Sequence, residues 1–151
     1  MKLFYAPASP FSTKVVMAAH HLGIELDLVP TATQDNPEDL LVANPLGKIP
    51  TLVTDEGETF YDSRTIMHYL NAIAGEDARI YPRNPEKRAA VERTEALSDG
   101  ICDAAILVIY ETRFRSPETW HQPWVDRQWD KVRRGLDHLD AHPPKFGKRL
   151  N

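Results

Sequence analysis

Cysteine is nearly absent from this sequence. Cys102 is the only thiol in 151 residues, so no disulfide can form within the chain. A single cysteine also cannot supply a C-x-x-C pair, which excludes an active site built from two redox thiols of this chain. Structural disulfides are rare in reducing compartments, and we therefore expect a cytoplasmic location.

Long apolar runs and an excess of basic residues are missing as well. No stretch is apolar over enough residues to span a bilayer or to act as a signal peptide. The formal net charge is −4, and the basic residues are interspersed with acidic ones. Proteins that bind nucleic acids usually carry a basic patch or stripe. We therefore expect neither a nucleic acid nor a membrane as partner.

The first half of the chain predicts alternating strands and helices. The apolar run 3–5 predicts a short strand over 2–5, and apolar residues recur every three or four positions over 11–22, as in a helix. Gly23 predicts the end of that helix. Apolar and acidic residues then alternate over 24–28, which indicates a second strand. A strand, a helix and a strand in this order predict a parallel crossover.

A hairpin and two further helices complete this part. Asn36 predicts the N-cap of a short helix that ends near Leu41. Residues 51–54 and 58–61 flank an Asp-Glu-Gly turn, which predicts two antiparallel strands. A helix is expected over 63–74, with the preceding aspartate as its cap. The predicted order is βαβαββα.

The second half predicts helices alone. We expect a first domain over 1–76, a proline-rich linker over 77–85 and a helical domain over 86–151. Two long helices, 86–113 and one from about residue 124, each carry an apolar stripe at helical spacing, formed by Leu97, Ile101, Ala104 and Val108 and by Val125, Trp129, Val132 and Leu136. Two helices bury little on their own, so this domain is expected to be incomplete.

Serine occupies the positions where a dithiol protein carries cysteine. Ser9-Pro10-Phe11-Ser12 follows the first strand and opens the first helix. A C-x-x-C at this place puts thiols at a helix N-terminus, which stabilises a thiolate. Serine forms no disulfide, but its hydroxyl and the helix amides can donate hydrogen bonds to a thiolate from another molecule. Ser9 is also typical of a helix N-cap, and the two roles do not conflict.

Two further motifs follow along the chain. Asn44-Pro45-Leu46-Gly47-Lys48-Ile49-Pro50 precedes the hairpin, and Asp62-Ser63 opens the next helix. Ser9-Pro10-Phe11 resembles the serine-type catalytic turn of tau-like and theta-like glutathione S-transferases. The segment 44–50 resembles the cis-proline loop of that family, and Asp62-Ser63 resembles its acidic-serine pair. The resemblance implies an α/β thioredoxin-like N-terminal domain and an all-helical C-terminal domain. Family members usually continue with a further buried helix, so we expect this chain to be truncated.

The resemblance implies that the Ser9 hydroxyl donates a hydrogen bond to the sulfur of glutathione and favours its thiolate. Ser12, one helical turn further on, is the rival candidate and is otherwise an auxiliary group. Phe11 belongs to the same turn and is expected at the glutathione site.

The other motifs are expected to hold the rest of the tripeptide. A cis Ile49-Pro50 bond is expected to present the backbone of Ile49 to the cysteinyl part of glutathione, as an added strand would. Lys48 is expected to meet the glycyl carboxylate. Asp62 suits the ammonium of the γ-glutamyl end, and the Ser63 hydroxyl and the helix amides suit its carboxylate. Each residue also has a structural interpretation, as a helix cap, a turn proline or a solvated charge.

The resemblance implies a glutathione transferase, in which glutathione is the co-substrate and a small hydrophobic electrophile is the second substrate. Glutathione-dependent reduction of a disulfide or peroxide is the alternative reaction, and a glutathione-binding interaction module is the non-enzymatic alternative. A homodimer is expected from the same resemblance. No metal site is expected, because His20 and His21 have no Cys, Asp or Glu at metal-ligand spacing nearby.

Overall fold

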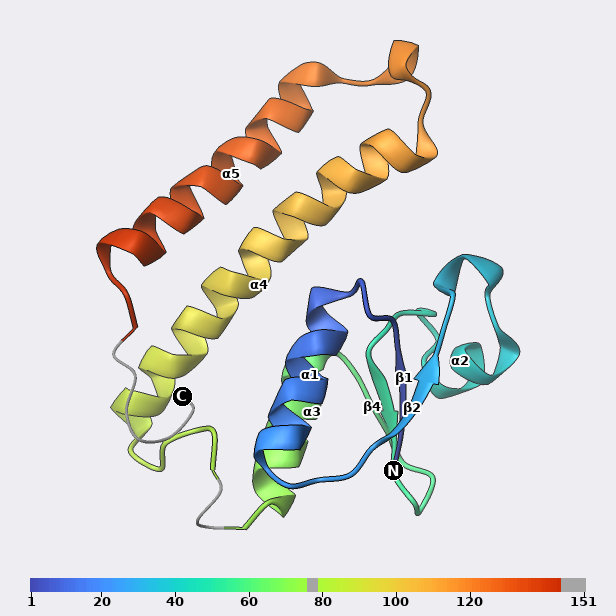
Figure 1. Ribbon diagram of the computed structural model, residues 1–151, viewed down its shortest axis with the longest axis vertical. Coiled ribbons are helices and arrows are strands. Elements are labelled where there is room, and N and C mark those ends of the chain that lie inside the picture. The colour runs from blue at the N-terminus through green and yellow to red at the C-terminus, as the bar shows by residue number, and fades with distance from the viewer. Residues whose placement is uncertain (76–78, 145–151) are drawn as a thin grey trace. The chain divides into compact units, whose positions relative to one another are not determined.

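The protein consists of two compact units, which meet in sequence between Pro82 and Arg83. The computed structural model describes residues 1–75 and 79–144. The first unit contains a mixed sheet with helices, and the second is helical (Figure 1). None of the described helices combines the length and the apolar composition needed to cross a membrane.

The sheet of the first unit has four strands in the spatial order β2-β1-β3-β4. Its strands are β1 (Lys2–Tyr5), β2 (Asp27–Pro30), β3 (Thr51–Val53) and β4 (Thr59–Phe60). β1 pairs with β2 in parallel and with β3 antiparallel, and β4 is antiparallel to β3. Both the parallel crossover and the hairpin are therefore as predicted.

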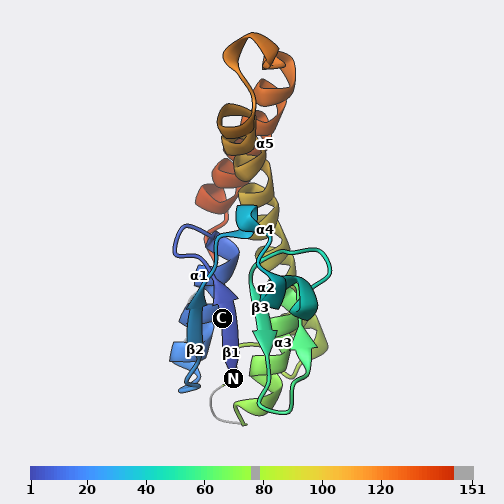
Figure 2. The ribbon, with the colours of Figure 1, turned by 90° about the vertical axis from the view of Figure 1, so that its right-hand side faces the viewer.

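Helices cover both faces of this sheet. α1 (Pro10–His21) and α3 (Ser63–Ile73) lie side by side on one face, and α2 (Glu38–Ala43) lies on the other (Figures 1 and 2). Phe4 packs with Leu40 and Ala43 of α2. Side chains alternate along a strand, so the fully buried Leu3 points to the opposite face, toward α1 and α3.

The second strand begins later than its alternating pattern predicts. Gly23 follows the end of α1, and the Ile24 N–H still bonds back to the Ala19 carbonyl at 2.9 Å. Pairing with β1 begins only at Asp27, opposite Lys2. The alternation over 24–28 therefore belongs partly to the helix end, and the strand runs over Asp27–Pro30.

Asn36 does not cap α2, in contrast to the prediction. It ends a short 3-10 helix, η1 (Thr33–Asp35), and has a left-handed backbone with φ 47°. Asparagine tolerates this conformation better than most residues. The residue at the N-cap of α2 is Pro37, which has no side-chain hydrogen bond to offer.

The second unit is a pair of helices, α4 (Pro85–Phe114) and α5 (Gln122–Ala141), which pack along each other (Figure 1). Their contact uses small residues: a Cβ added to Gly135 would lie 2.5 Å from Cγ1 of Ile101. Val125 and Val132 are buried as predicted. Trp129 and Leu136 were expected in the same stripe, but they are 44% and 53% exposed.

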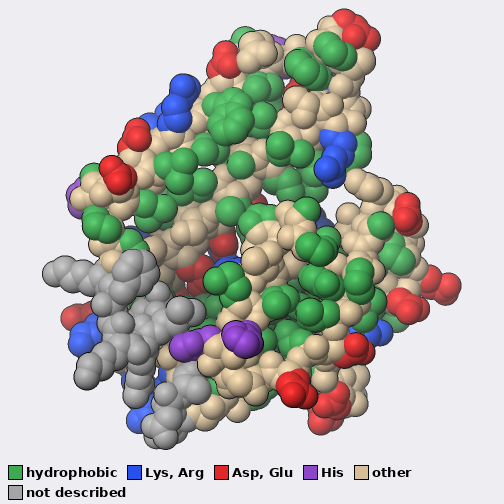
Figure 3. All heavy atoms as spheres, viewed as in Figure 1, with side chains coloured by type: hydrophobic (Ala, Val, Ile, Leu, Met, Phe, Trp, Pro, Cys, Tyr) green, Lys and Arg blue, Asp and Glu red, His purple; other side chains and the backbone are tan. Residues whose placement is uncertain are grey.

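Apolar side chains remain exposed on this helical pair. Figure 3 shows them spread over the viewed face of α4 and α5. The large exposed ones include Leu107, Tyr110, Phe114, Trp129 and Leu136. At Gly135 the two helices pack without room for a Cβ, while bulkier apolar groups face outward.

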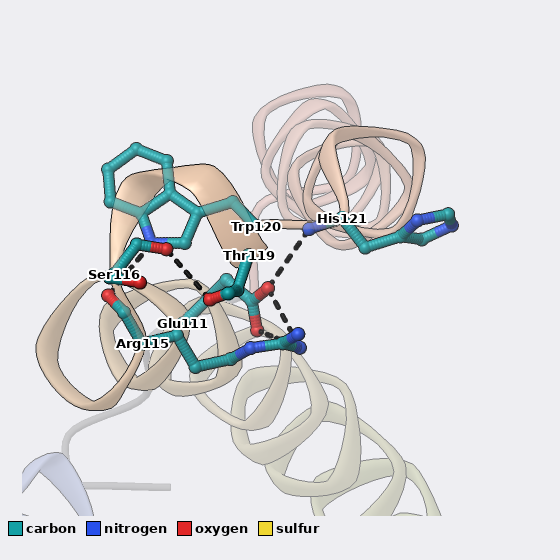
Figure 4. A network of polar contacts seen from close by, with 6 residues as sticks. All are labelled: Glu111, Arg115, Ser116, Thr119, Trp120 and His121. Atoms are coloured by element: carbon teal, nitrogen blue, oxygen red, sulfur yellow. Dashed lines mark hydrogen bonds and ion pairs between the residues drawn. The ribbon is translucent and has the colours of Figure 1, made fainter.

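A polar network closes the connection between α4 and α5, which contains the short helix η2 (Pro117–Thr119). Glu111 is buried, and its carboxylate accepts a hydrogen bond from the backbone N–H of His121 at 3.1 Å and pairs with Arg115 at 3.2 Å (Figure 4). The Trp120 indole N–H donates to the Arg115 carbonyl at 3.1 Å. One glutamate therefore holds both ends of the connection.

Candidate functional site

Three loops of the first unit meet at one end of its sheet. The end of β1 pairs with the start of β3, since Phe4 is opposite Thr51. The end of β4 lies beside the same part of β3, since Phe60 is opposite Leu52. These positions are continued by the segments 6–9, 48–50 and 61–63, which therefore lie at the same end of the sheet. They contain Ser9, Lys48, Ile49, Pro50, Asp62 and Ser63, and Phe11 and Ser12 follow in the first turn of α1.

Ser9 is the N-cap of α1. Its hydroxyl oxygen accepts a hydrogen bond from the backbone N–H of Ser12 at 3.2 Å, and its carbonyl accepts from the N–H of Thr13 at 3.0 Å. Ser9 is half-buried, and its hydroxyl hydrogen has no acceptor among the described residues. This group can accept a bond from the helix and donate one away from it at the same time.

Ser12 has a different environment from Ser9. It is 0% exposed, and its hydroxyl oxygen has no hydrogen-bond partner in the described part of the chain. Its backbone amide, in contrast, points to Ser9. Phe11, between them, is half-buried. The turn therefore brings one accessible hydroxyl and one enclosed hydroxyl to the start of α1.

A buried asparagine organises the loop before β3. The Asn44 side chain donates to the Lys48 carbonyl at 3.1 Å and to the Thr51 hydroxyl at 3.0 Å, and it accepts from the Leu46 N–H at 3.0 Å. Asn44 is 1% exposed and Thr51 is 0% exposed. The loop is therefore held from inside, at its start and at its end.

The same loop requires a glycine. Gly47 has φ 60°, and a Cβ there would lie 3.1 Å from Cδ2 of Leu41. Both the left-handed backbone and the close side chain disfavour other residues. Lys48 is exposed, Ile49 is half-buried, and the Ile49–Pro50 bond is cis, as the sequence resemblance implied.

The third loop opens α3. Asp62 is its N-cap, and one carboxylate oxygen accepts from the Arg64 N–H at 3.1 Å. Asp62 is exposed, whereas Ser63 is buried. Helix N-termini carry partial positive charge and favour anions. The start of α3 therefore places the Asp62 carboxylate, which favours a cation, beside backbone amides that favour an anion.

The sequence did not identify the organising side chains of this site. In the sequence, Asn44 is part of the loop motif and Thr51 begins a predicted strand, and neither pattern predicts that the side chain organises the loop. A polar residue within an otherwise apolar segment is the pattern that could have predicted them, because a buried polar side chain must form hydrogen bonds. No group of three potential metal ligands occurs among residues 1–75 and 79–144.

Comparison with known proteins agrees with this architecture. The profile described as Glutathione S-transferase, N-terminal domain, matches residues 3–78. YibF of Escherichia coli (strain K12), described as an uncharacterized GST-like protein, is 33% identical over 142 residues, which are 94% of this chain and 69% of YibF. The chain belongs to the glutathione S-transferase family. Its first unit is the thioredoxin-like domain of that family, and its second unit belongs to the helical domain.

Two solved glutathione transferase structures are similar to this chain over most of its length. A family member from Pseudomonas fluorescens Pf-5, with bound glutathione, is 39% identical with a TM-score of 0.85; the match covers 93% of this chain and 70% of that chain. A glutathione S-transferase from Methylobacillus flagellatus KT with GSH bound is 35% identical with a TM-score of 0.89, over 99% of this chain and 74% of that chain.

Proposed function

We propose that this member of the glutathione S-transferase family binds glutathione at the end of the sheet where these three loops lie. We also propose that Ser9 stabilises the glutathione thiolate for attack on a small hydrophobic electrophile. The observation that carries the proposal is the geometry of Ser9. Its oxygen accepts from the Ser12 N–H, while its hydrogen is available to an acceptor outside the helix. Glutathione bound to two similar structures supports the choice of ligand.

The hydroxyl acts on the thiol through the charged form. A hydrogen bond donated to a thiolate favours it over the thiol and lowers the pKa of the glutathione sulfur. Hydrogen bonds to charged groups are worth about 1.5 to 3 kcal/mol. The thiolate then attacks the electrophilic carbon, a sulfur–carbon bond forms, the leaving group departs with its electron pair, and the thiol proton has already passed to solvent.

The remaining contacts position the tripeptide. In this proposal the Ile49 backbone pairs with the cysteinyl part, and Lys48 meets the glycyl carboxylate. Asp62 holds the γ-glutamyl ammonium, while Ser63 and the α3 amides hold the carboxylate beside it. Phe11 lies at the same turn as Ser9 and contacts the ligand there, and Ser12 supports Ser9 through its amide.

We also propose a cytoplasmic homodimer. The exposed apolar side chains of α4 and α5 support an apolar contact with a second copy. Sedimentation equilibrium tests the homodimer, and a monomer across the micromolar range contradicts it.

Two measurements on the purified protein test the function. Titration calorimetry with glutathione tests binding, and conjugation of glutathione to a chlorodinitrobenzene, followed by absorbance, tests transfer. The pH dependence of kcat/KM for the electrophile, measured at saturating glutathione, reports the pKa of the enzyme-bound thiol. Binding accompanied only by disulfide or peroxide reduction favours the reductase hypothesis. Binding without any of these activities favours a glutathione-binding module, and the absence of binding contradicts the proposal as a whole.

A further inference from the structure

Two buried side chains converge on a single backbone atom, the carbonyl oxygen of Lys48. The Thr51 hydroxyl donates to it at 2.8 Å and the Asn44 amide at 3.1 Å. The two side chains are also bonded to each other at 3.0 Å. Both are almost inaccessible to solvent, whereas the Lys48 side chain is exposed. The carbonyl of Lys48 is therefore fixed toward the interior.

The position of this carbonyl determines the direction of the next amide. The Lys48 carbonyl and the Ile49 N–H belong to one planar peptide group, which is trans. In such a group the C=O and N–H bonds point in opposite directions. Because Asn44 and Thr51 hold the oxygen inward, the Ile49 N–H must point away from them. Among the described residues, this N–H has no hydrogen-bond acceptor.

We propose that Asn44 and Thr51 are positioning residues, which present the Ile49 N–H to the cysteinyl carbonyl of glutathione by fixing the peptide group between Lys48 and Ile49. The inference rests on the proposed glutathione site. Neither side chain touches the ligand in this arrangement. Their effect is to order a donor in advance, so that binding does not have to restrict the peptide group.

A buried threonine elsewhere in the same unit provides a matched control. Thr54 is 6% exposed, and its hydroxyl accepts a single bond from the Glu58 N–H at 3.2 Å in the hairpin turn. Thr51→Val and Thr54→Val each replace a buried hydroxyl by a methyl group. Only the first removes contacts to the Lys48 carbonyl. Thr51→Ser keeps the hydroxyl. Asn44→Asp keeps the oxygen that accepts from the Leu46 N–H but removes the bonds donated to the Lys48 carbonyl and the Thr51 hydroxyl.

The experiment measures the dissociation constant for glutathione by calorimetry and the kcat and KM of conjugation, for the full chain and the four variants. Circular dichroism and thermal melting establish that each is folded. Thr51→Val and Asn44→Asp are expected to weaken binding about tenfold, the loss of roughly one hydrogen bond to a bound ligand. Thr51→Ser should stay within about threefold of wild type and Thr54→Val within about twofold. The KM for glutathione should rise while kcat at saturation changes little, because the lost contact acts equally on ground and transition states.

The outcomes separate this inference from the proposed function. If the wild type binds glutathione but Thr51→Val binds as tightly as Thr54→Val, the positioning role is wrong and the glutathione site stands. If Thr51→Val does not fold, wild-type affinity of Asn44→Asp likewise overturns the positioning role. If the wild type shows no binding, the proposed function fails and this inference fails with it.

Discussion

The hydroxyl oxygen of Ser9 accepts a hydrogen bond from the backbone amide of Ser12 at 3.2 Å and so caps the N-terminus of α1. This bond fixes the oxygen of Ser9 and leaves its hydrogen available to an acceptor outside the helix. In the proposed site, the same side chain has two roles: it stabilises the helix and it donates to the glutathione sulfur. A substitution that separates these roles is the most direct test of the site.

Ser9→Asp is expected to preserve the fold and abolish activation. Aspartate caps helices as well as serine does, so the melting temperature should change little. Its ionised carboxylate donates no hydrogen bond and repels a thiolate. We expect kcat/KM for conjugation to fall at least 100-fold at pH 7, by about the 1.5 to 3 kcal/mol of a charged hydrogen bond plus the repulsion. Ser9→Ala should fall about 10- to 100-fold and also lose about 1 kcal/mol of stability.

Ser12→Ala is the control for this pair. The Ser12 hydroxyl is enclosed and has no partner among the described residues, so its removal should be neutral or stabilise the protein by up to about 1 kcal/mol in urea denaturation. The activity should remain within about twofold, because the Ser12 backbone amide is unchanged. A loss of activity equal to that of Ser9→Ala assigns thiolate stabilisation to Ser12 instead.

Asp62→Asn is expected to weaken glutathione binding without loosening α3. Asparagine is as good an N-cap as aspartate, so the bond to the Arg64 N–H is kept and the melting temperature should be unchanged. The charge that we propose for the γ-glutamyl ammonium is lost, and the affinity should fall about 10-fold or more. Calorimetry with glutathione and with its N-acetylated derivative provides the measurement. If wild type and variant bind glutathione equally well, the ammonium lies elsewhere.

Alanine substitutions at two helical glycines are expected to have opposite effects. Gly135→Ala gains helix propensity but places a Cβ 2.5 Å from Ile101 Cγ1, and overpacking costs about 1 to 3 kcal/mol. We expect net destabilisation of about 1 kcal/mol or more in urea unfolding. Gly100→Ala, on α4, has no atom within 4 Å of the new Cβ and should stabilise by up to about 1 kcal/mol. Stabilisation by both substitutions contradicts the close contact at Gly135.

Glu111→Ala is expected to destabilise the helical unit. It leaves the partly buried His121 N–H without its acceptor and removes the pair with Arg115, at a cost of about 2 to 3 kcal/mol. Glu111→Gln retains an acceptor oxygen and should cost less. Glu92→Ala removes a partly exposed i,i+4 pair with Arg88 and should change stability by less than about 0.5 kcal/mol. Equal unfolding free energies for the alanine variants contradict the role of Glu111.

Local signals in the sequence predicted the elements that they directly specify. Ser9 and Asp62 are the helix caps that their residue types predict, and the hairpin surrounds the expected Asp-Glu-Gly turn. Long-range contacts were harder to predict. The start of β2 depends on the pairing of Asp27 with Lys2, which no local alternation reveals.

The helical unit shows the same limit. A stripe of large apolar residues predicted that Trp129 faces α4, but the helices meet at Gly135, which allows a closer approach than any larger residue. Buried polar residues were missed for a related reason. Asn44, Thr51 and Glu111 are buried because of the backbone groups that they satisfy, and those groups are brought to them by the fold.

The outer strands of the sheet have a consequence for solution behaviour. β4 contributes two residues, and β2 ends in Pro30, whose backbone has no N–H. Short outer strands and proline offer few backbone hydrogen-bond groups to another chain. Natural sheets use both features to avoid amyloid-like growth. The margins of this sheet therefore disfavour its extension by backbone pairing with a second copy.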